Sequence, residues 1–139
     1  MPGIIKLNGL NYRIVDVKNG SIWEHVKRIR ADDREVLGYK VMHNVAYFSP
    51  RYKKWIGAEA GDRSDGATYA KDINTFAWLF HDELCNNGTF EDGTLCNNLQ
   101  ASAVCYDLLN DSGRWFRRYT WFAATWLFGG GEARKNSMW

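Results

Sequence analysis

The segment that decides the fold is residues 61–85, which read GDRSDGATYAKDINTFAWLFHDELC. Its first half is rich in glycine, aspartate and serine, residues that favour loops and turns. Apolar residues then recur at helical spacing from Phe76 onward, and Asp72 is a suitable N-cap for a helix that runs to about Leu84. The Asn-Asn-Gly sequence at 86–88 ends that helix. We therefore expect a loop that leads directly into a core helix.

The first sixty residues are typical of an antiparallel sheet. Residues 3–17 alternate loosely between apolar and polar, and the Asn-Gly dipeptides at 8–9 and 19–20 favour tight hairpin turns. Residues 41–56 are rich in β-branched and aromatic side chains, with a turn at Ser49-Pro50. We expect two or three strands in the first stretch and two in the second. Residues 21–29 fit either a helix or a strand.

Two more helices are predicted after the first. Asp92 or Thr94 can cap a helix that ends near Leu109, and the aromatic-rich segment 114–128 forms a third. The uncharged run 119–128 is well short of the ~20 apolar residues that cross a bilayer, so a buried helix is favoured over an interfacial membrane helix.

The expected fold is α+β, with an N-terminal antiparallel sheet packed by about three C-terminal helices. The length and the lack of a linker indicate a single domain over residues 1–139, with 1–60 mostly strands, 61–71 a loop and 72–130 helical.

Composition narrows the class of protein. The chain has 139 residues, a formal net charge of +2, and seven each of Trp, Tyr and Phe. So small a charge gives no strong nucleic-acid signal, and each local basic cluster is interpreted as a solvated face. Residues 1–10 have no sustained apolar run, so we expect no signal peptide, and no transmembrane segment is predicted. Cysteines without a CxxC pair favour a reducing compartment and argue against a zinc knuckle.

His81 and neighbouring carboxylates form the candidate catalytic site. Histidine changes charge near neutral pH and serves as a general base or a metal ligand. Antiparallel packing of the first two predicted helices would bring Asp107 or Asp111 to the imidazole, where a carboxylate fixes the tautomer. Asp82 and the loop residue Asp65 would add hard oxygen ligands. We therefore predict His81, Asp82 and Asp107 as catalytic residues, and Asp65, His81 and Asp82 as ligands of a divalent metal that activates water.

A structural interpretation stands beside this one at each position. His81 would be a core histidine bonded to a backbone carbonyl, Asp65 an Asx-turn residue and Asp82 a solvent-facing helix residue. Trp78 shares the helix face of His81, and Trp55 could form a stacking surface for a nucleic acid, flanked by the basic residues Arg51, Lys53 and Lys54. Both tryptophans are therefore candidate binding residues. The alternative for Trp55 is an ordinary strand with its aromatic side chains turned inward.

These residues carry a resemblance to a family of small, uncharacterised bacteriophage and prophage proteins. The family pattern is a strand-rich N-terminal half, an Asp-Gly-Ala-Ser/Thr segment, a helix with His-Asp, and a second helix. The matching positions are Asp-Gly-Ala-Thr at 65–68, His-Asp at 81–82 and Asp107, and the resemblance covers about residues 55–130. The chain departs from the pattern at Tyr69, where proline is common, and at Cys85, where an aromatic is frequent. The resemblance implies a phage origin, an α+β fold and a location in the host cytoplasm or the virion.

Two classes of function follow. The first is a small phage-encoded protein with a polar His/Asp site, acting as a metal-dependent hydrolase. The second is a non-enzymatic phage protein, either a virion component or a binder of a host defence factor, whose partner is a phage or host protein or a second copy of the chain. The large aromatic inventory favours the second class, because it exceeds what one small core readily hides. Carboxylates that converge with His81 in a pocket would favour the enzyme.

Overall fold

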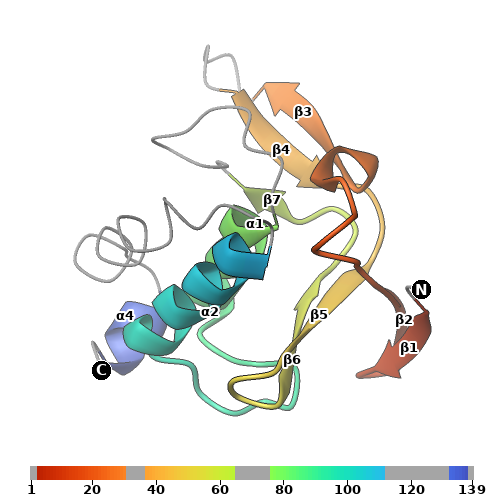
Figure 1. Ribbon diagram of the computed structural model, residues 1–139. Coiled ribbons are helices and arrows are strands. Elements are labelled where there is room, and N and C mark those ends of the chain that lie inside the picture. The colour runs from red at the N-terminus through yellow and green to blue at the C-terminus, as the bar shows by residue number, and fades with distance from the viewer. Residues whose placement is uncertain (1–2, 31–36, 65–75, 112–131, 138–139) are drawn as a thin grey trace.

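The computed structural model describes residues 3–30, 37–64, 76–111 and 132–137 (Figure 1). The elements in these residues are β1 (Ile4–Leu7), β2 (Leu10–Ile14), the 3-10 turn η1 (Ile22–Glu24), β3 (Val26–Arg30), β4 (Leu37–Val41), β5 (Val45–Ser49), β6 (Lys54–Ala58), β7 (Arg63–Ser64), α1 (Ala77–Asn87), α2 (Asn98–Asp111) and α4 (Glu132–Asn136). The α+β class is confirmed.

Within the described residues, four strands form a sheet in the order β1-β2-β5-β6. β1 and β2 make a predicted hairpin, in which Asn8 (φ 50°) and Gly9 (φ 82°) adopt the left-handed conformation that its two-residue turn requires. β5 and β6 make the second predicted hairpin, which turns after Ser49. The prediction of a wholly antiparallel sheet is wrong, because β2 runs parallel to β5 and pairs Arg13 with Val45. Parallel neighbours need a long crossover, which residues 15–44 supply.

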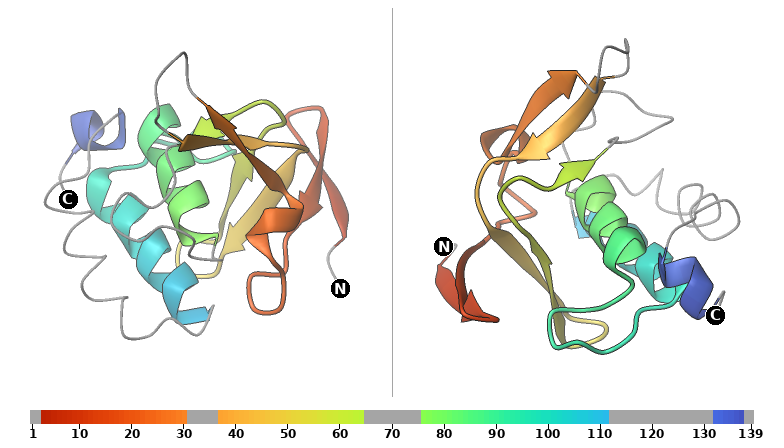
Figure 2. Two further views of the ribbon diagram at one scale, coloured as in Figure 1. Left: turned by 90° about the horizontal axis from the view of Figure 1, so that it is seen from above. Right: turned by 180° about the vertical axis from the view of Figure 1, so that it is seen from behind.

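Two strands of that crossover, β3 and β4, join β7 in a second sheet, with the order β3-β4-β7 in the described part of the chain. Residues 21–29, for which the sequence fits either a helix or a strand, contain both: the 3-10 turn η1 comes first and strand β3 follows it. β7 lies within residues 61–71, where the sequence predicts only a loop. Figures 1 and 2 show this second sheet at the end of the molecule away from α4.

Helix α1 is the centre of the core. It packs against β6, α2 and α4, and its buried residues occupy almost its whole circumference. A helix that is apolar on most sides is stable only when other elements surround it. As predicted, the helix ends before Gly88 (φ 68°), whose N–H donates to the Leu84 carbonyl at 2.8 Å. The predicted N-cap, Asp72, lies outside the described residues.

Helix α2 begins later than predicted. Asp92 and Thr94 do not cap it: the Asp92 carboxylate accepts from the Thr94 N–H at 2.9 Å and closes a local turn instead. The helix starts after Asn97, whose side chain accepts from the Gln100 N–H at 2.8 Å, while the Gln100 side chain accepts from the Asn97 N–H at 3.0 Å. This reciprocal capping box satisfies backbone donors that Asp92 cannot reach.

The third predicted helix, 114–128, lies outside the described residues. Within them, the helical layer consists of α1, α2 and the short α4, which the sequence did not predict. Asn136 of α4 donates to the carbonyls of Gly88 and Cys96, each at 2.8 Å, so α4 ties the end of α1 to the segment before α2. None of the described helices is long and apolar enough to cross a membrane.

Candidate active site

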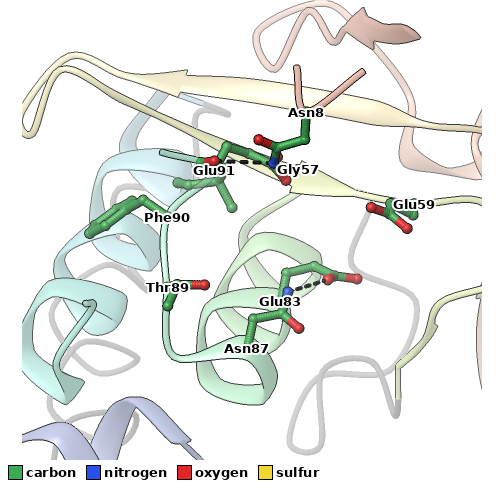
Figure 3. Close-up of a pocket in the computed structure, with 9 residues that line it drawn as sticks. Asn8, Gly57, Glu59, Glu83, Asn87, Thr89, Phe90 and Glu91 are labelled. Carbon is green, nitrogen blue, oxygen red and sulfur yellow. Dashed lines mark hydrogen bonds between the residues drawn. The ribbon is translucent and has the colours of Figure 1, made fainter. Parts of the chain in front are cut away.

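A small polar pocket lies along the edge of β6, between α1, the segment after α1 and the β1–β2 turn (Figure 3). It is lined by Asn8, Ile56, Gly57, Glu59, Glu83, Asn87, Thr89, Phe90 and Glu91. Its volume is about 110 Å³. Ligand sites for drug-sized molecules are about 300 Å³ or larger, so this pocket suits a single polar ring or functional group.

Glu83 is the most buried acid of the pocket. It lies on α1 with 6 % of its surface exposed, and it accepts a hydrogen bond from the Asn87 side chain at 3.3 Å. Burial, followed by a hydrogen bond with the Asp62 carboxylate, raises the pKa of Glu83 to about 9. Glu83 therefore holds a proton at neutral pH and donates a hydrogen bond to the Asp62 carboxylate. The Glu83 carboxyl group is thus a potential proton donor in the pocket.

Glu91 and Glu59 place two more acids at the pocket. The Glu91 carboxylate accepts from Asn8 at 2.8 Å, and the Glu59 carboxylate accepts from the Tyr12 hydroxyl at 3.1 Å. Burial and the nearby Glu59 raise the pKa of Glu91, while the Asn8 hydrogen bond opposes that shift. Burial, then the charge of Glu91 and the hydrogen bond to Glu59, also raise the pKa of Tyr12. Burial is the larger cause of both shifts, and the negative charges held close together add to it.

Gly57 makes this arrangement sterically possible. A Cβ atom at that position would collide with the Glu91 carboxyl group and would lie 2.9 Å from the Tyr12 ring. Glycine inside a strand commonly marks such a close approach. The side chains of Glu91 and Tyr12 thus pack directly against the β6 backbone at Gly57.

His81 lies on a different side of α1 from Glu83 and Asn87, since residues four apart share a helix face. It is 8 % exposed; its Nδ1 lies 3.8 Å from an Asp82 oxygen, and its Nε2 lies 3.5 Å from the Cys85 sulfur. Burial lowers the pKa of His81, but the Asp82 carboxylate and the Cys85 sulfur outweigh it and raise the pKa to about 9. The structure thus brings the buried His81 and Cys85 together with Asp82, whose side chain is 30 % exposed.

Asp107 has a partner that the sequence did not indicate. Its two carboxylate oxygens accept from the Arg51 guanidinium at 2.7 and 2.8 Å. These hydrogen bonds raise the pKa of Arg51. Asp107 therefore binds Arg51 in the β5–β6 turn. Among the described contacts there is no hydrogen bond between Asp107 and His81, so its predicted role of fixing the His81 tautomer stays a prediction.

The predicted binding residues belong to packed aromatic pairs. Trp78 is 4 % exposed and its ring lies 5.0 Å from that of Tyr39. Trp55 is half-buried and lies 5.1 Å from the ring of Phe48, which is 40 % exposed. Trp55 therefore lies beside an exposed apolar side chain.

The predicted metal site combines Asp65 with His81 and Asp82. Asp65 lies outside the described residues. Among the residues that are described, no group of three or more His, Cys, Asp or Glu side chains could hold a metal ion. The cysteines Cys85, Cys96 and Cys105 are all free and buried. The metal site therefore stays a prediction.

The acids of the pocket were missed because each looks like an ordinary surface acid in the sequence. Two signals point to them in retrospect. Glu83 and Asn87 stand four apart, so they share a helix face. Gly57 interrupts an otherwise strand-like run and indicates a close approach by another group.

Comparison of the chain with protein-family models, with curated proteins and with solved structures gave no match.

Proposed function

We propose that the chain is a hydrolase whose catalytic acid and base are carboxyl groups of the β6 pocket. The observation that carries this proposal is the environment of Glu83, a carboxyl group that keeps its proton at neutral pH while other acids line the same cavity. A carboxyl group that holds its proton can act as a general acid while a second carboxyl group of the same site acts as a general base. Glu83 would protonate the leaving group, and Glu59 would activate water.

A glycosidic bond is the substrate class that fits best. Its hydrolysis uses one protonated and one ionised carboxyl group on either side of the bond. Asn8, Asn87 and Thr89 add amide and hydroxyl groups to the lining, which can hydrogen-bond to sugar hydroxyls. The cavity volume of about 110 Å³ limits the contact to roughly one ring.

The test is turnover of a panel of fluorogenic glycosides by the parent and by Glu83→Gln and Glu59→Gln. Loss of a catalytic acid or base should lower the rate by ~10²–10⁴-fold. Glu24→Gln is the matched control, since Glu24 is an exposed glutamate on η1 that does not line the pocket. Activity of the parent should also fall as the pH rises through about 9, where Glu83 loses its proton. Turnover that survives Glu83→Gln, or no turnover of any glycoside, would reject this assignment.

The metal-dependent form of the hydrolase, with His81, Asp82 and Asp65, is kept as a separate proposal. It is supported by the 3.8 Å approach of Asp82 to His81. Elemental analysis of the parent and of His81→Ala tests it. A divalent metal in the parent that is lost in the variant would support it, and no metal in either protein would reject it.

A non-enzymatic phage protein is the second candidate class. Its support is a set of exposed apolar side chains, which could contact a phage or host protein or a second copy of the chain: Ile4, Leu10, Met42, Phe48 and Leu95. Light scattering on the purified protein tests self-association. A strictly monomeric protein that captures no phage or host protein would count against this class. Phage origin, and location in the host cytoplasm or virion, rest on the sequence resemblance.

A further inference from the structure

The second sheet gathers basic side chains that are far apart in the sequence. In its register, Lys27 of β3 lies directly opposite Lys40 of β4, and Lys40 lies directly opposite Arg63 of β7. Neighbouring strands are about 4.8 Å apart, so the three residues form one row across the sheet. We call Lys27, Lys40 and Arg63 the basic row.

The basic row points away from the protein core. Side chains alternate between the two faces of a strand. Val26 and Val41, the paired residues next to Lys27 and Lys40, are 3 % and 1 % exposed and belong to the core cluster. The row is therefore on the opposite face, where Lys27 and Arg63 are exposed and Lys40 is half-buried.

This arrangement costs stability on its own. Like charges directly opposite one another on a sheet repel. Strands β3, β4 and β7 contain no acidic residue, and no member of the basic row forms an ion pair with a carboxylate of the described residues. An anion that lies across the row would relieve the repulsion.

Arg28 lies on the other face of β3, and its guanidinium is 5.8 Å from the centre of the Trp23 ring. That face is held against the core by Val26 and Val41, so the basic row is the surface that a ligand can reach. The phosphates of a nucleic acid supply a closely spaced row of negative charges that matches such a row of cations.

We propose that the second sheet binds the phosphate backbone of a nucleic acid through the basic row. An acidic protein is the less suitable partner, because lysine is depleted in protein–protein interfaces and the row itself contains no apolar side chain. Contacts to phosphate carry no sequence information, so the binding is expected to be independent of sequence. This surface is separate from the carboxylate pocket, and its function does not depend on the hydrolase proposal.

The experiment measures fluorescence anisotropy of labelled duplex and single-stranded oligonucleotides of mixed sequence, over a series of salt concentrations. The test variant is Lys27→Thr with Lys40→Thr, since threonine is well tolerated in strands. The matched control is Lys6→Thr with Lys18→Thr, which removes two exposed lysines outside the second sheet. Arg63→Thr is measured separately. Circular dichroism and thermal unfolding check that each variant is folded.

For duplex DNA, each lost phosphate contact lowers the slope of log K against log salt by about 0.9, so the test variant should lose about 1.8 and Arg63→Thr about 0.9. For single strands the corresponding loss is about 0.7 per contact. Comparison of the two affinities at one salt concentration identifies the form that the protein prefers. The control should keep the parent's slope, and removal of the repelling charges should leave the test variant at least as stable as the parent. Three results would overturn the proposal: no binding at low salt, equal losses in the test variant and the control, or stronger competition by polyglutamate than by unlabelled DNA at equal charge.

Discussion

Glu91 lies directly over Gly57, and only the absence of a side chain at Gly57 leaves room for its carboxyl group. A Cβ atom there would collide with the Glu91 carboxyl oxygen and lie 2.8 Å from Glu91 Cδ. One backbone position thus controls how an acid enters the pocket.

Gly57→Ala should therefore displace Glu91 rather than unfold the protein. The end of a glutamate side chain moves easily, whereas the Tyr12 ring, 2.9 Å from the new Cβ, must shift within the core. We expect a loss of roughly 1–3 kcal/mol in the free energy of unfolding, typical of overpacking. The raised pKa of Glu91 should fall towards its ordinary value as the carboxyl group moves into water. Urea unfolding and carboxyl-carbon NMR titration measure the two effects.

The control for this prediction is Gly3→Ala, because a Cβ at Gly3 meets no atom within 4 Å. In a Glu91→Ala background, Gly57→Ala should cost less than in the parent, since one of its two collisions is gone. An unchanged Glu91 pKa in Gly57→Ala would show that the glycine does not position this acid.

Glu83 makes the stability of the protein depend on pH. Its pKa is raised to about 9 in the folded protein from 4.5, so between these values the folded state holds a proton that the unfolded state has lost. Stability should then fall as the pH rises from about 4.5 towards 9, because the unfolded state binds fewer protons. Glu83→Gln removes this contribution to the pH dependence of stability and keeps the shape of the side chain.

Urea unfolding of the parent and of Glu83→Gln at pH 5 and pH 8 measures the difference. The variant should gain stability relative to the parent by a few kcal/mol as the pH rises, since each unit of pKa shift corresponds to about 1.36 kcal/mol. Parallel pH dependences in the two proteins would mean that Glu83 titrates normally and is not the proton donor of the pocket.

The features predictable from the sequence are those set by neighbouring residues. The β1–β2 turn follows from Asn8-Gly9, and the end of α1 follows from Gly88, because each needs a left-handed backbone at one or two positions. The parallel pairing of Arg13 with Val45 could not be predicted in this way. It depends on where a thirty-residue crossover returns the chain, which local residue patterns do not encode.

In the candidate site, too, contacts between residues close in sequence are predictable, whereas contacts between distant residues are not. The contact of His81 with Cys85 follows from their spacing on one helix. The pocket brings together Glu59, Glu83 and Glu91 from a strand end, a helix and a connecting segment. Before the fold is known, each is indistinguishable from a solvated acid, and only Gly57 hints that another group approaches β6.

The histidines should titrate in two distinct ranges. His25 Nδ1 and His43 Nε2 lie 2.7 Å apart, and burial lowers the pKa of both rings; the charge of His43 lowers that of His25 further, and Arg13 also lowers both. Burial lowers the pKa of His81 too, but Asp82 and Cys85 reverse the shift and raise it to about 9. NMR titration of the imidazole protons should give two values below 6.5 and one above it.

The lowered pKa values of His25 and His43 and the raised pKa of His81 make the free energy of unfolding depend on pH in opposite directions. The His25–His43 contribution is present above pH 6.5 and lost as the pH falls, because the unfolded rings then bind protons first. The His81 contribution is present below pH 6.5 and lost as the pH rises through about 9. Asp82→Asn should move the pKa of His81 downward, whereas Asp92→Asn, at an exposed aspartate, should leave it unchanged. An Asp82→Asn protein with an unshifted His81 would contradict the ion pair.

Asp107 should act through Arg51 rather than through His81. The side chain of Arg51 is 48 % exposed and that of Asp107 is 20 % exposed, so solvent screens much of their attraction. Asp107→Ala and Arg51→Ala should each cost about 0.5–1 kcal/mol in urea unfolding, and the double variant should cost less than their sum, because both remove the same contact. The pKa of His81 should not change in either variant, and the two proteins should have the same activity. If Asp107→Ala shifts the His81 titration while Arg51→Ala does not, the carboxylate reaches the imidazole as the sequence predicted, and Asp107 returns to the catalytic set.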